Sequence, residues 1–193
     1  MTTFNVYLAG VGGQGIGLLS EMILRSADHA GLQVKGVDTH GLAQRGGIVV
    51  SQIRMGRKVH TPLIPAGQAD LVVALERHEA LRALAAFGKP GGFLIYYNTV
   101  WQPLDVRLGE ATEVSAADIQ AQCRQSRIGL REVCESSLED VRMQNMAVLA
   151  NIAREGLIPE VSKQHYLLSM EDLMAGDMLA RNRLLFEKTI DDR

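Results

Sequence analysis

Cysteine is scarce in this chain of 193 residues: there are two, Cys123 and Cys134, and their spacing forms no C-x-x-C pair. Neither a disulfide framework nor a redox pair is therefore expected, and both thiols are expected to be reduced and structural. Iron–sulfur clusters are held by about four cysteine thiolates. This sequence is therefore not expected to hold such a cluster alone.

Charge of one sign and long apolar runs are also lacking. The formal net charge is −2 and no block of like charges stands out, which argues against nucleic acid and anionic membrane surfaces as partners. The longest apolar runs, Leu71–Leu75 and Phe93–Tyr97, fall far short of the roughly 18 residues that span a bilayer. The first residues show no signal or transit pattern, so we expect a soluble, cytoplasmic protein.

Apolar residues are plentiful, at 47% of the chain, which is enough to build one substantial core. No internal repeat, low-complexity segment or linker interrupts the sequence. Residues 1–193 are therefore expected to form a single domain.

The N-terminal segment predicts a strand, a helix and a second strand. Phe4–Ala9 is an almost unbroken apolar run, typical of a strand covered on both faces. Apolar residues at helical spacing predict a helix over Ile16–Ala30, and Gly31 supplies its stop. Gln33–Asp38 then reads as the next strand, completing a unit long enough for a right-handed crossover.

The following segments extend the sheet. Thr39–Gly47 is too short for a crossover helix, so the β-branched run Ile48–Gly56 is predicted to be an antiparallel strand. A second crossover follows in Asp70–Leu75, Glu76–Phe87 and Gly92–Tyr97, read as strand, helix and strand. The expected fold class is α/β: a Rossmann-like three-layer α/β/α domain whose sheet is mostly parallel with one antiparallel strand.

The signal is weaker in the rest of the chain. A helix over Ser115–Arg124 and a short strand over Gly129–Cys134 are predicted. A further helix is expected to open at Ser137. Met170–Ile190 is expected to be helical, with a break at Gly176.

A glycine turn joins the first strand to the first helix. Gly10, Gly12 and Gly15 satisfy G-x-G-x-x-G, and Gly13 adds a glycine that a simple turn would not require. Missing side chains let a phosphate approach the backbone, and the free amides of the helix end attract negative charge. The turn, with Gln14 inside it, is predicted to bind an anion, although a purely structural turn is the alternative.

The second strand ends in a polar, glycine-framed loop. Asp38 lies where a dinucleotide-binding domain places its ribose acceptor. The residues after it suit a phosphate or carboxylate instead, since an arginine is a forked donor and amide and imidazole groups add hydrogen bonds. Taken singly, each of them could equally well pair with a carboxylate in the loop. As a group they predict a binding loop made of His40, Gln44, Arg45, Gly46 and Gly47.

Two stretches together resemble a known family: "GVGGQGIGLLSEMI" at Gly10–Ile23 and "GVDTHGLAQRGGIVVSQIRMG" at Gly36–Gly56. The family is the gamma-type subunit or domain of the 2-oxoacid:ferredoxin oxidoreductases, most closely its indolepyruvate oxidoreductase beta-subunit branch. Weaker matches are "ADLVVALERHEALRAL", Asn98 and "NMAVLANIAREGLIP". The final third matches only loosely.

The resemblance implies one part of a larger complex that oxidatively decarboxylates 2-oxoacids to acyl-coenzyme A and passes electrons to ferredoxin. Thiamine diphosphate and the iron–sulfur clusters would belong to other subunits, so this chain would be inactive alone, without catalytic residues of its own. Its contribution would be a docking surface and part of the substrate or coenzyme A passage. The functional edge would comprise Gly12, Gly13, Gln14, Gly15 and the loop from His40 to Gly47.

Two other functions remain open from the residues themselves. The glycine turn and Asp38 also fit a stand-alone NAD- or flavin-dependent oxidoreductase, although no catalytic tyrosine–lysine pair is identifiable. The other hypothesis is a non-catalytic interaction module that responds to a nucleotide. A homodimer of the isolated chain is compatible with each of them.

Overall fold

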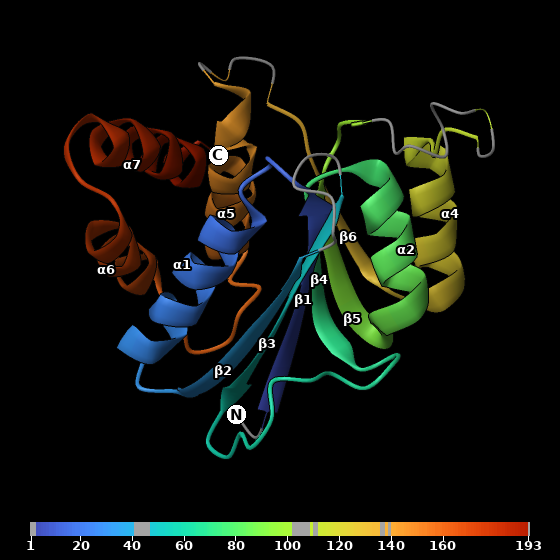
Figure 1. Cartoon of the computed structure of the whole chain (residues 1–193), viewed down its shortest axis with the longest axis horizontal. Helices are drawn as coiled ribbons and strands as arrows, with labels where there is room; N and C mark the ends of the chain where they lie inside the picture. Colours follow the sequence, from blue (N-terminus) through green and yellow to red (C-terminus); the bar gives the residue numbers. More distant parts are fainter. Residues whose placement is uncertain are drawn as a thin grey trace.

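The computed structural model describes residues 3–40, 47–101, 109, 112–135, 138 and 140–192. A six-stranded sheet runs through the middle of the molecule, with helices on both faces (Figure 1). The strands lie in the order β2-β3-β1-β4-β5-β6. Their bounds are β1 Thr3–Val11, β2 Gln33–His40, β3 Ile48–Gly56, β4 Ala69–Ala74, β5 Gly88–Tyr97 and β6 Gly129–Val133.

Strand β3 is the antiparallel member of the sheet. It pairs antiparallel with both β1 and β2, whereas β1, β4, β5 and β6 pair parallel in series. The prediction of a mostly parallel sheet with an antiparallel strand at Ile48–Gly56 is confirmed. The first crossover, however, passes over β3, which lies between β1 and β2.

The helices form the outer two layers (Figure 1). One face is covered by α2 and α4, and the other by α1, α5, α6 and α7. The bounds are α1 Ile16–His29, α2 Arg77–Phe87, α4 Ala116–Ser126, α5 Gln144–Arg154, α6 Lys163–Leu173 and α7 Gly176–Asp191, with the 3₁₀ turn η1 at Val141–Met143. The three-layer α/β/α arrangement is as predicted. Within the described residues, no helix is long and apolar enough to cross a membrane.

Side chains of strand β1 are buried in the cores on both faces of the sheet. Val6 and Leu8 belong to the core beneath α1, α5, α6 and α7, while Tyr7 and Ala9 belong to the core beneath α2 and α4. All four side chains are buried. Successive side chains of a strand point to opposite faces, so an apolar run is what burial on both faces requires.

Two helix boundaries differ from the prediction. The helix expected to open at Ser137 begins at Gln144, after η1, where the Asp140 carboxylate accepts the amide hydrogen of Arg142. Ser137 itself lies outside the described residues. The helical segment predicted over Met170–Ile190 begins earlier, at Lys163. Its predicted break at Gly176 is confirmed: α6 ends at Leu173 and α7 begins at Gly176, with Met174 and Ala175 extended between them.

Candidate functional site

The chain leaves the carboxyl ends of β1 and β4 in opposite directions across the sheet. Strands β1 and β4 are parallel neighbours, but α1 leads from β1 toward β2, and α2 leads from β4 toward β5. The two helices therefore cover opposite faces of the sheet (Figure 1). In open α/β sheets, ligands bind in the crevice that such a reversal leaves at the carboxyl ends of the strands.

The glycine turn occupies this edge. Gly13 and Gly15 have φ values of 103° and 80°, which L-residues with side chains rarely adopt. Gly15 is the N-cap of α1; in the part of the chain that the structure describes, no side chain caps the helix, and its first turn holds no acidic residue. The helix end therefore offers unsatisfied amide hydrogens and the positive end of its dipole to negative charge.

Gln14 has a different setting from the one predicted. Its side chain is buried, with Oε1 accepting the amide hydrogen of Val11 at 2.8 Å. Its Nε2 donates to the carbonyl oxygen of Leu75 at 2.7 Å and lies 3.4 Å from Oε1 of Gln144. Gln14 thus ties together the ends of β1 and β4 and the start of α5, which fixes the shape of the turn.

A cavity of about 350 Å³ opens beside the turn. Its charged residues come from η1 and α7, and Asn145 reaches in from α5, where its Nδ2 donates to the carbonyl oxygen of Gly15 at 3.3 Å. The lining is made of Gly13, Gly15, Leu18, Asp140, Arg142, Met143, Asn145, Met178, Arg181 and Asn182. A helix N-terminus facing two guanidinium groups across a cavity is suited to an anionic ligand.

The two arginines of the cavity differ in their partners. Arg142 holds Asp140 through a fork of hydrogen bonds, the shortest 2.6 Å, and these bonds lower the pKa of Asp140 to about 2. Asp140 therefore stays ionised and engages Arg142. The Nε of Arg181 donates to the carbonyl oxygen of Asp177 at 3.4 Å, and the charge of Arg181 also helps to lower the pKa of Asp140.

The predicted loop meets the glycine turn at one described residue. The amide of Gly12 donates to the carbonyl oxygen of Gly47 at 2.9 Å, so the end of the loop lies against the turn. Residues Gln44, Arg45 and Gly46, and the side chain of His40, lie outside the described part of the chain. Gly10 lies within β1, where a Cβ would come 2.8 Å from the side chain of Ile16, so its role there is close helix packing.

Asp38 lies apart from the glycine turn. It pairs with Ser51 of β3, on the edge strand β2, and Ser20 donates to its carboxylate at 3.4 Å. Because β3 separates β2 from β1, Asp38 lies two strand spacings, about 10 Å, from Leu8 of β1, which itself precedes the glycine turn. A dinucleotide fold that places β2 directly beside β1 has no such gap.

A family model described as pyruvate ferredoxin/flavodoxin oxidoreductase matches residues 5–191. The chain belongs to this family.

Curated relatives in this family carry the name indolepyruvate oxidoreductase subunit IorB. The Archaeoglobus fulgidus protein is 53% identical over 78 residues, which is 40% of this chain and 38% of that protein. The Pyrococcus horikoshii protein is 34% identical over 120 residues, 62% of this chain and 59% of that protein. The chain thus spans between about two fifths and three fifths of the length of these relatives.

Solved structures of two oxidoreductases share the fold of this chain. The gamma subunit of a keto/oxoacid ferredoxin oxidoreductase from Geobacter sulfurreducens aligns with a TM-score of 0.63 at 19% identity, over 97% of this chain and 96% of that chain. The 2-oxoglutarate:ferredoxin oxidoreductase from Magnetococcus marinus aligns with a TM-score of 0.67 at 18% identity, over 98% of this chain and 30% of that chain. The α/β fold predicted from the sequence is that of these oxidoreductase proteins.

Sequence patterns did not predict three residues that lie beside the glycine turn. Trp101 is 38% exposed, and its ring would lie 3.8 Å from a Cβ placed on Gly13. Arg142 and Arg181 join the glycine turn from distant parts of the chain. No local motif marks these three residues. The only sequence signal is the aromatic residue Trp101 shortly after the predicted strand Gly92–Tyr97.

Two buried carboxyl groups lie on the α2 side of the same edge. Glu76 is fully buried, and one of its oxygens accepts the amide hydrogen of Glu79, while Oε2 has no hydrogen-bond partner among the described residues. Burial raises the pKa of Glu76. Burial also raises the pKa of Glu79 to about 7, although Arg82 opposes the shift. Sequence spacing predicted these residues only as the first turn of a helix.

The histidines and buried amides hold structural positions. His29 pairs with Asp172 at 2.8 Å, and His165 completes the capping box of α6. Asn151 is buried, donates to the carbonyl oxygen of Ala147 and accepts from Arg154. Among the described residues, no three His, Cys, Asp or Glu side chains gather as a metal site.

Proposed function

We propose that this chain is an accessory subunit of a cytoplasmic 2-oxoacid:ferredoxin oxidoreductase of the indolepyruvate or other aryl-pyruvate type. The family match over residues 5–191 and the names of the curated relatives support this function. In such a reaction the 2-oxoacid loses its carboxyl group as carbon dioxide and the acyl group joins the sulfur of coenzyme A. The thiol proton is released and the electron pair passes to ferredoxin.

The chain's own part in this reaction is binding. Thiamine diphosphate and the iron–sulfur clusters would supply the carbanion and electron-transfer chemistry from partner subunits. This chain would hold a negatively charged group, either a phosphate of coenzyme A or the carboxylate of the 2-oxoacid. No catalytic residue is proposed for it.

One observation carries this role: the uncapped N-terminus of α1 opens onto a cavity that Arg142 and Arg181 also line. Amide hydrogens at Gly13 and Gly15 allow close approach of an anion, because no side chain intervenes. Gln14 acts by positioning the turn through its buried bonds rather than by contacting the ligand.

The loop from His40 to Gly47 is proposed as the second wall of the site. The hydrogen bond between Gly12 and Gly47 brings the end of this loop to the turn. Arg45 would then add a further guanidinium, with His40, Gln44 and Gly46 beside it. Asp38 is left out of the proposed anion site, because its carboxylate would repel the ligand and β3 separates it from the turn.

The test is purification from native cells, followed by identification of the bound subunits and an iron assay. A brown complex that contains a thiamine-diphosphate subunit is expected. In that complex, Arg181→Ala and Arg45→Ala should raise KM for coenzyme A or for the 2-oxoacid by about tenfold, as loss of a charged hydrogen bond does. Arg124→Ala, on exposed α4, is the control and should leave KM unchanged. A chain that always purifies alone would overturn the proposal.

The stand-alone NAD-dependent enzyme is not favoured by the comparisons. It predicts saturable NADH binding that Asp38→Ala abolishes. Titration of the purified chain with NADH and, separately, with coenzyme A distinguishes the two functions.

A further inference from the structure

Two cations lie directly opposite each other near the start of β2 and the end of β3. Lys35 and Arg54 are cross-strand partners in the antiparallel register, so their side chains share one face of the sheet. Asn5 of β1 is the next residue on this row, and its Oδ1 accepts a hydrogen bond from Nε of Arg54 at 3.0 Å. Like charges in directly opposite positions destabilise a sheet, so this arrangement has a cost that the fold does not require.

A third cation lies beside this pair. Lys58 is exposed in the loop after β3, and the amide of the next residue, Val59, donates to Oε1 of Gln33 at 3.4 Å. Gln33 is two residues before Lys35 on β2, so the side chains of Gln33 and Lys35 lie on the same face. His60 is also exposed in this loop. We call the surface formed by Lys35, Arg54, Lys58 and His60 the basic tip.

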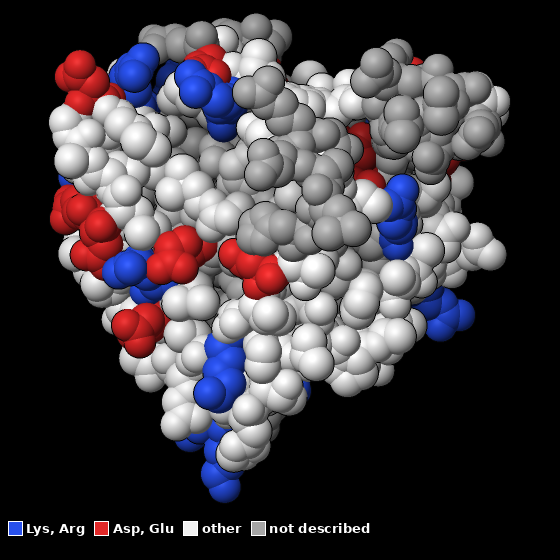
Figure 2. Space-filling view, viewed as in Figure 1, with Lys and Arg blue, Asp and Glu red and all other residues white. Residues whose placement is uncertain are grey.

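The charges of the basic tip are not matched within the described part of the chain. Its two lysines and its arginine form no ion pair with any residue that the structure describes. Asp70, which accepts the amide hydrogen of Asn5, is already paired with Lys89 at 2.6 Å. Arg57 is left out of the tip because it interacts with Glu160. Figure 2 shows Lys and Arg atoms, and no Asp or Glu atoms, on the visible side of the narrow lower end of the molecule.

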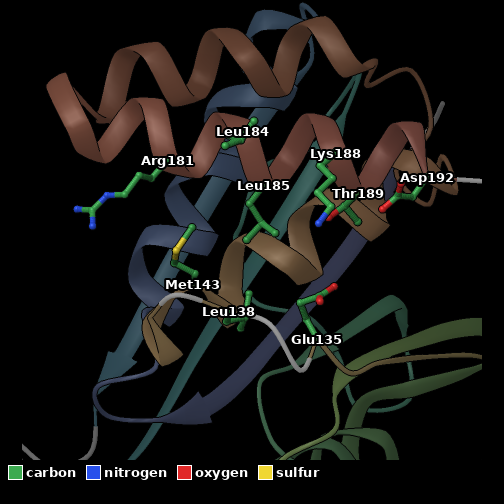
Figure 3. Close-up of a pocket in the computed structure, with 9 residues that line it drawn as sticks. All are labelled: Glu135, Leu138, Met143, Arg181, Leu184, Leu185, Lys188, Thr189 and Asp192. Carbon is green, nitrogen blue, oxygen red and sulfur yellow. The ribbon is translucent and has the colours of Figure 1, made fainter.

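The hollow between α7 and the segment that leads to α5 is electrostatically balanced by comparison (Figure 3). This cavity has a volume of about 210 Å³. Arg181 and Lys188 line it together with Glu135 and Asp192, so cations and carboxylates are equal in number there. The charge of that cavity therefore selects no class of partner, whereas the charge of the basic tip selects an acidic one.

Protection of the sheet edge accounts for only part of this pattern. Strand β2 is an edge strand, and lysine on an edge strand opposes pairing with another chain. That role would explain Lys35. It does not explain Arg54 on the next strand inward or Lys58 in the loop.

The basic tip and the glycine turn lie toward opposite ends of the sheet. Asn5 lies on the row of the tip and Val11 at the turn, and this length of β1 covers about 20 Å. A subunit seated over the glycine turn therefore need not cover the tip.

We propose that the basic tip attracts and docks the electron acceptor of the complex, the ferredoxin. This inference rests on the proposed function, which supplies the acceptor. An iron–sulfur cluster held by about four cysteine thiolates is an anion, and it gives the nearby surface of a small carrier protein a negative potential. Opposite charges raise the association rate of weak redox encounters, whose interfaces are small. Electrons would pass directly from a cluster of the partner subunit to the acceptor, not through this chain.

A permanent subunit interface fits the basic tip less well. Obligate interfaces are large and rich in apolar groups, whereas the residues of the tip are charged or polar. Leu63, 58% exposed, adds an apolar side chain beside it, and its carbonyl oxygen accepts from Nη1 of Arg54 at 3.4 Å. A second copy of this chain would bring the same cations together across a two-fold axis.

The test measures reduction of ferredoxin by the complex purified from cells that express the tagged chain. Lys35→Glu/Lys58→Glu reverses two charges at exposed positions. At about 20 mM NaCl it should raise KM for ferredoxin by at least about tenfold and leave kcat unchanged, and about 0.5 M NaCl should remove most of the difference. Turnover with the small dye methyl viologen, which needs no docking surface, should stay unchanged.

A matched control makes the same change of charge elsewhere. Arg124→Glu/Arg127→Glu alters two exposed positions at the end of α4, which packs on β5 and β6 at the other side of the sheet from β2. It should change KM for ferredoxin by less than about twofold. Lys35→Glu replaces a like-charge pair with an opposite-charge pair, so urea unfolding should find Lys35→Glu/Lys58→Glu at least as stable as the original chain.

The outcomes separate this inference from the proposed function. If the unaltered chain recovers no thiamine-diphosphate, iron-containing subunit, the proposed function fails. If the complex reduces ferredoxin and the two double variants have equal KM values, the function stands and docking at the basic tip is wrong. Loss of the partner subunit from the Lys35→Glu/Lys58→Glu complex would overturn the inference and assign the tip to assembly. Binding of duplex DNA that this variant abolishes, with KM for ferredoxin unchanged, would assign the tip to nucleic acid instead.

Discussion

Gln14 donates a hydrogen bond from Nε2 to the carbonyl oxygen of Leu75 at 2.7 Å, which joins the turn after β1 to the turn after β4. Both groups are buried, and the other side of the amide accepts from Val11. Gln14→Ala would leave a buried donor and a buried acceptor unpaired. We expect the free energy of unfolding to fall by about 2–4 kcal/mol.

Urea unfolding measures this loss. Gln120→Ala, on the exposed side of α4, is the control and should change the free energy of unfolding by less than about 0.5 kcal/mol. Equal effects of the two substitutions would show that the bonds of Gln14 do not hold the turn.

A comparison of two glycines separates backbone strain from crowding. Gly15 and Gly31 have φ values of 80° and 75°, but a Cβ on Gly15 would lie 2.6 Å from Nδ2 of Asn145, while one on Gly31 meets nothing within 4 Å. Gly31→Ala should cost about 1 kcal/mol of stability from strain alone. Gly15→Ala should cost about 1–2 kcal/mol more.

The cause of that excess is tested by the Gly15→Ala/Asn145→Ala double-mutant cycle. A coupling of about 1 kcal/mol between the two positions is expected, since removing the amide relieves the clash. Strict additivity would contradict the steric explanation.

Neighbouring residues of α7 should differ sharply in their effect on folding. Phe186 is fully buried and its ring lies 6.0 Å from that of Tyr166, whereas Leu184 is 68% exposed. Phe186→Ala should lower the free energy of unfolding by about 3–5 kcal/mol. Leu184→Ala should change it by no more than about 0.5 kcal/mol. Thermal and urea unfolding of the isolated chain measure both, and a large loss at Leu184 would assign that side chain to the fold.

The carboxyl group of Glu79 makes stability depend on pH. Burial raises its pKa to about 7, above the value of 4.5 for an unperturbed glutamic acid. The unfolded chain therefore releases this proton at lower pH than the folded chain. The stability that the group contributes is complete below about pH 4.5 and is lost as the pH rises through 7.

Glu79→Gln removes this titration. The fall in the free energy of unfolding between pH 5 and pH 8 should be smaller in the variant than in the original chain, by an amount on the order of 1–2 kcal/mol. Asp28→Asn, at an exposed position of α1, should leave the fall unchanged. Identical pH profiles for Glu79→Gln and the original chain would show that Glu79 titrates normally.

Local patterns were sufficient for most elements of the sheet. The unbroken apolar run of β1 predicted burial on both faces, and the short connection to β3 predicted an antiparallel strand. The insertion of β3 between β1 and β2 could not be predicted, because strands choose neighbours by contacts far apart in the sequence. The start of α5 was missed because the cap at Asp140 closes a separate 3₁₀ turn.

The candidate site was predictable where a motif defines it. The G-x-G-x-x-G spacing between a predicted strand and a predicted helix identified the glycine turn, and the structure places Gly15 at the N-terminus of α1. The cavity depends on Arg142 and Arg181, which reach the turn only through the packing of α5 and α7. An arginine in an amphipathic segment looks the same in sequence whether it faces bulk water or a hollow.

The position of β3 between β1 and β2 has a consequence for synthesis of the chain. When a ribosome has released residues only as far as His40, β1 and β2 are both made, yet neither has its antiparallel neighbour. The sheet can close only after Ile48–Gly56 emerges and inserts between them. A nascent chain stalled before Ile48 should thus expose two unpaired strand edges, the state in which this protein is most vulnerable to aggregation.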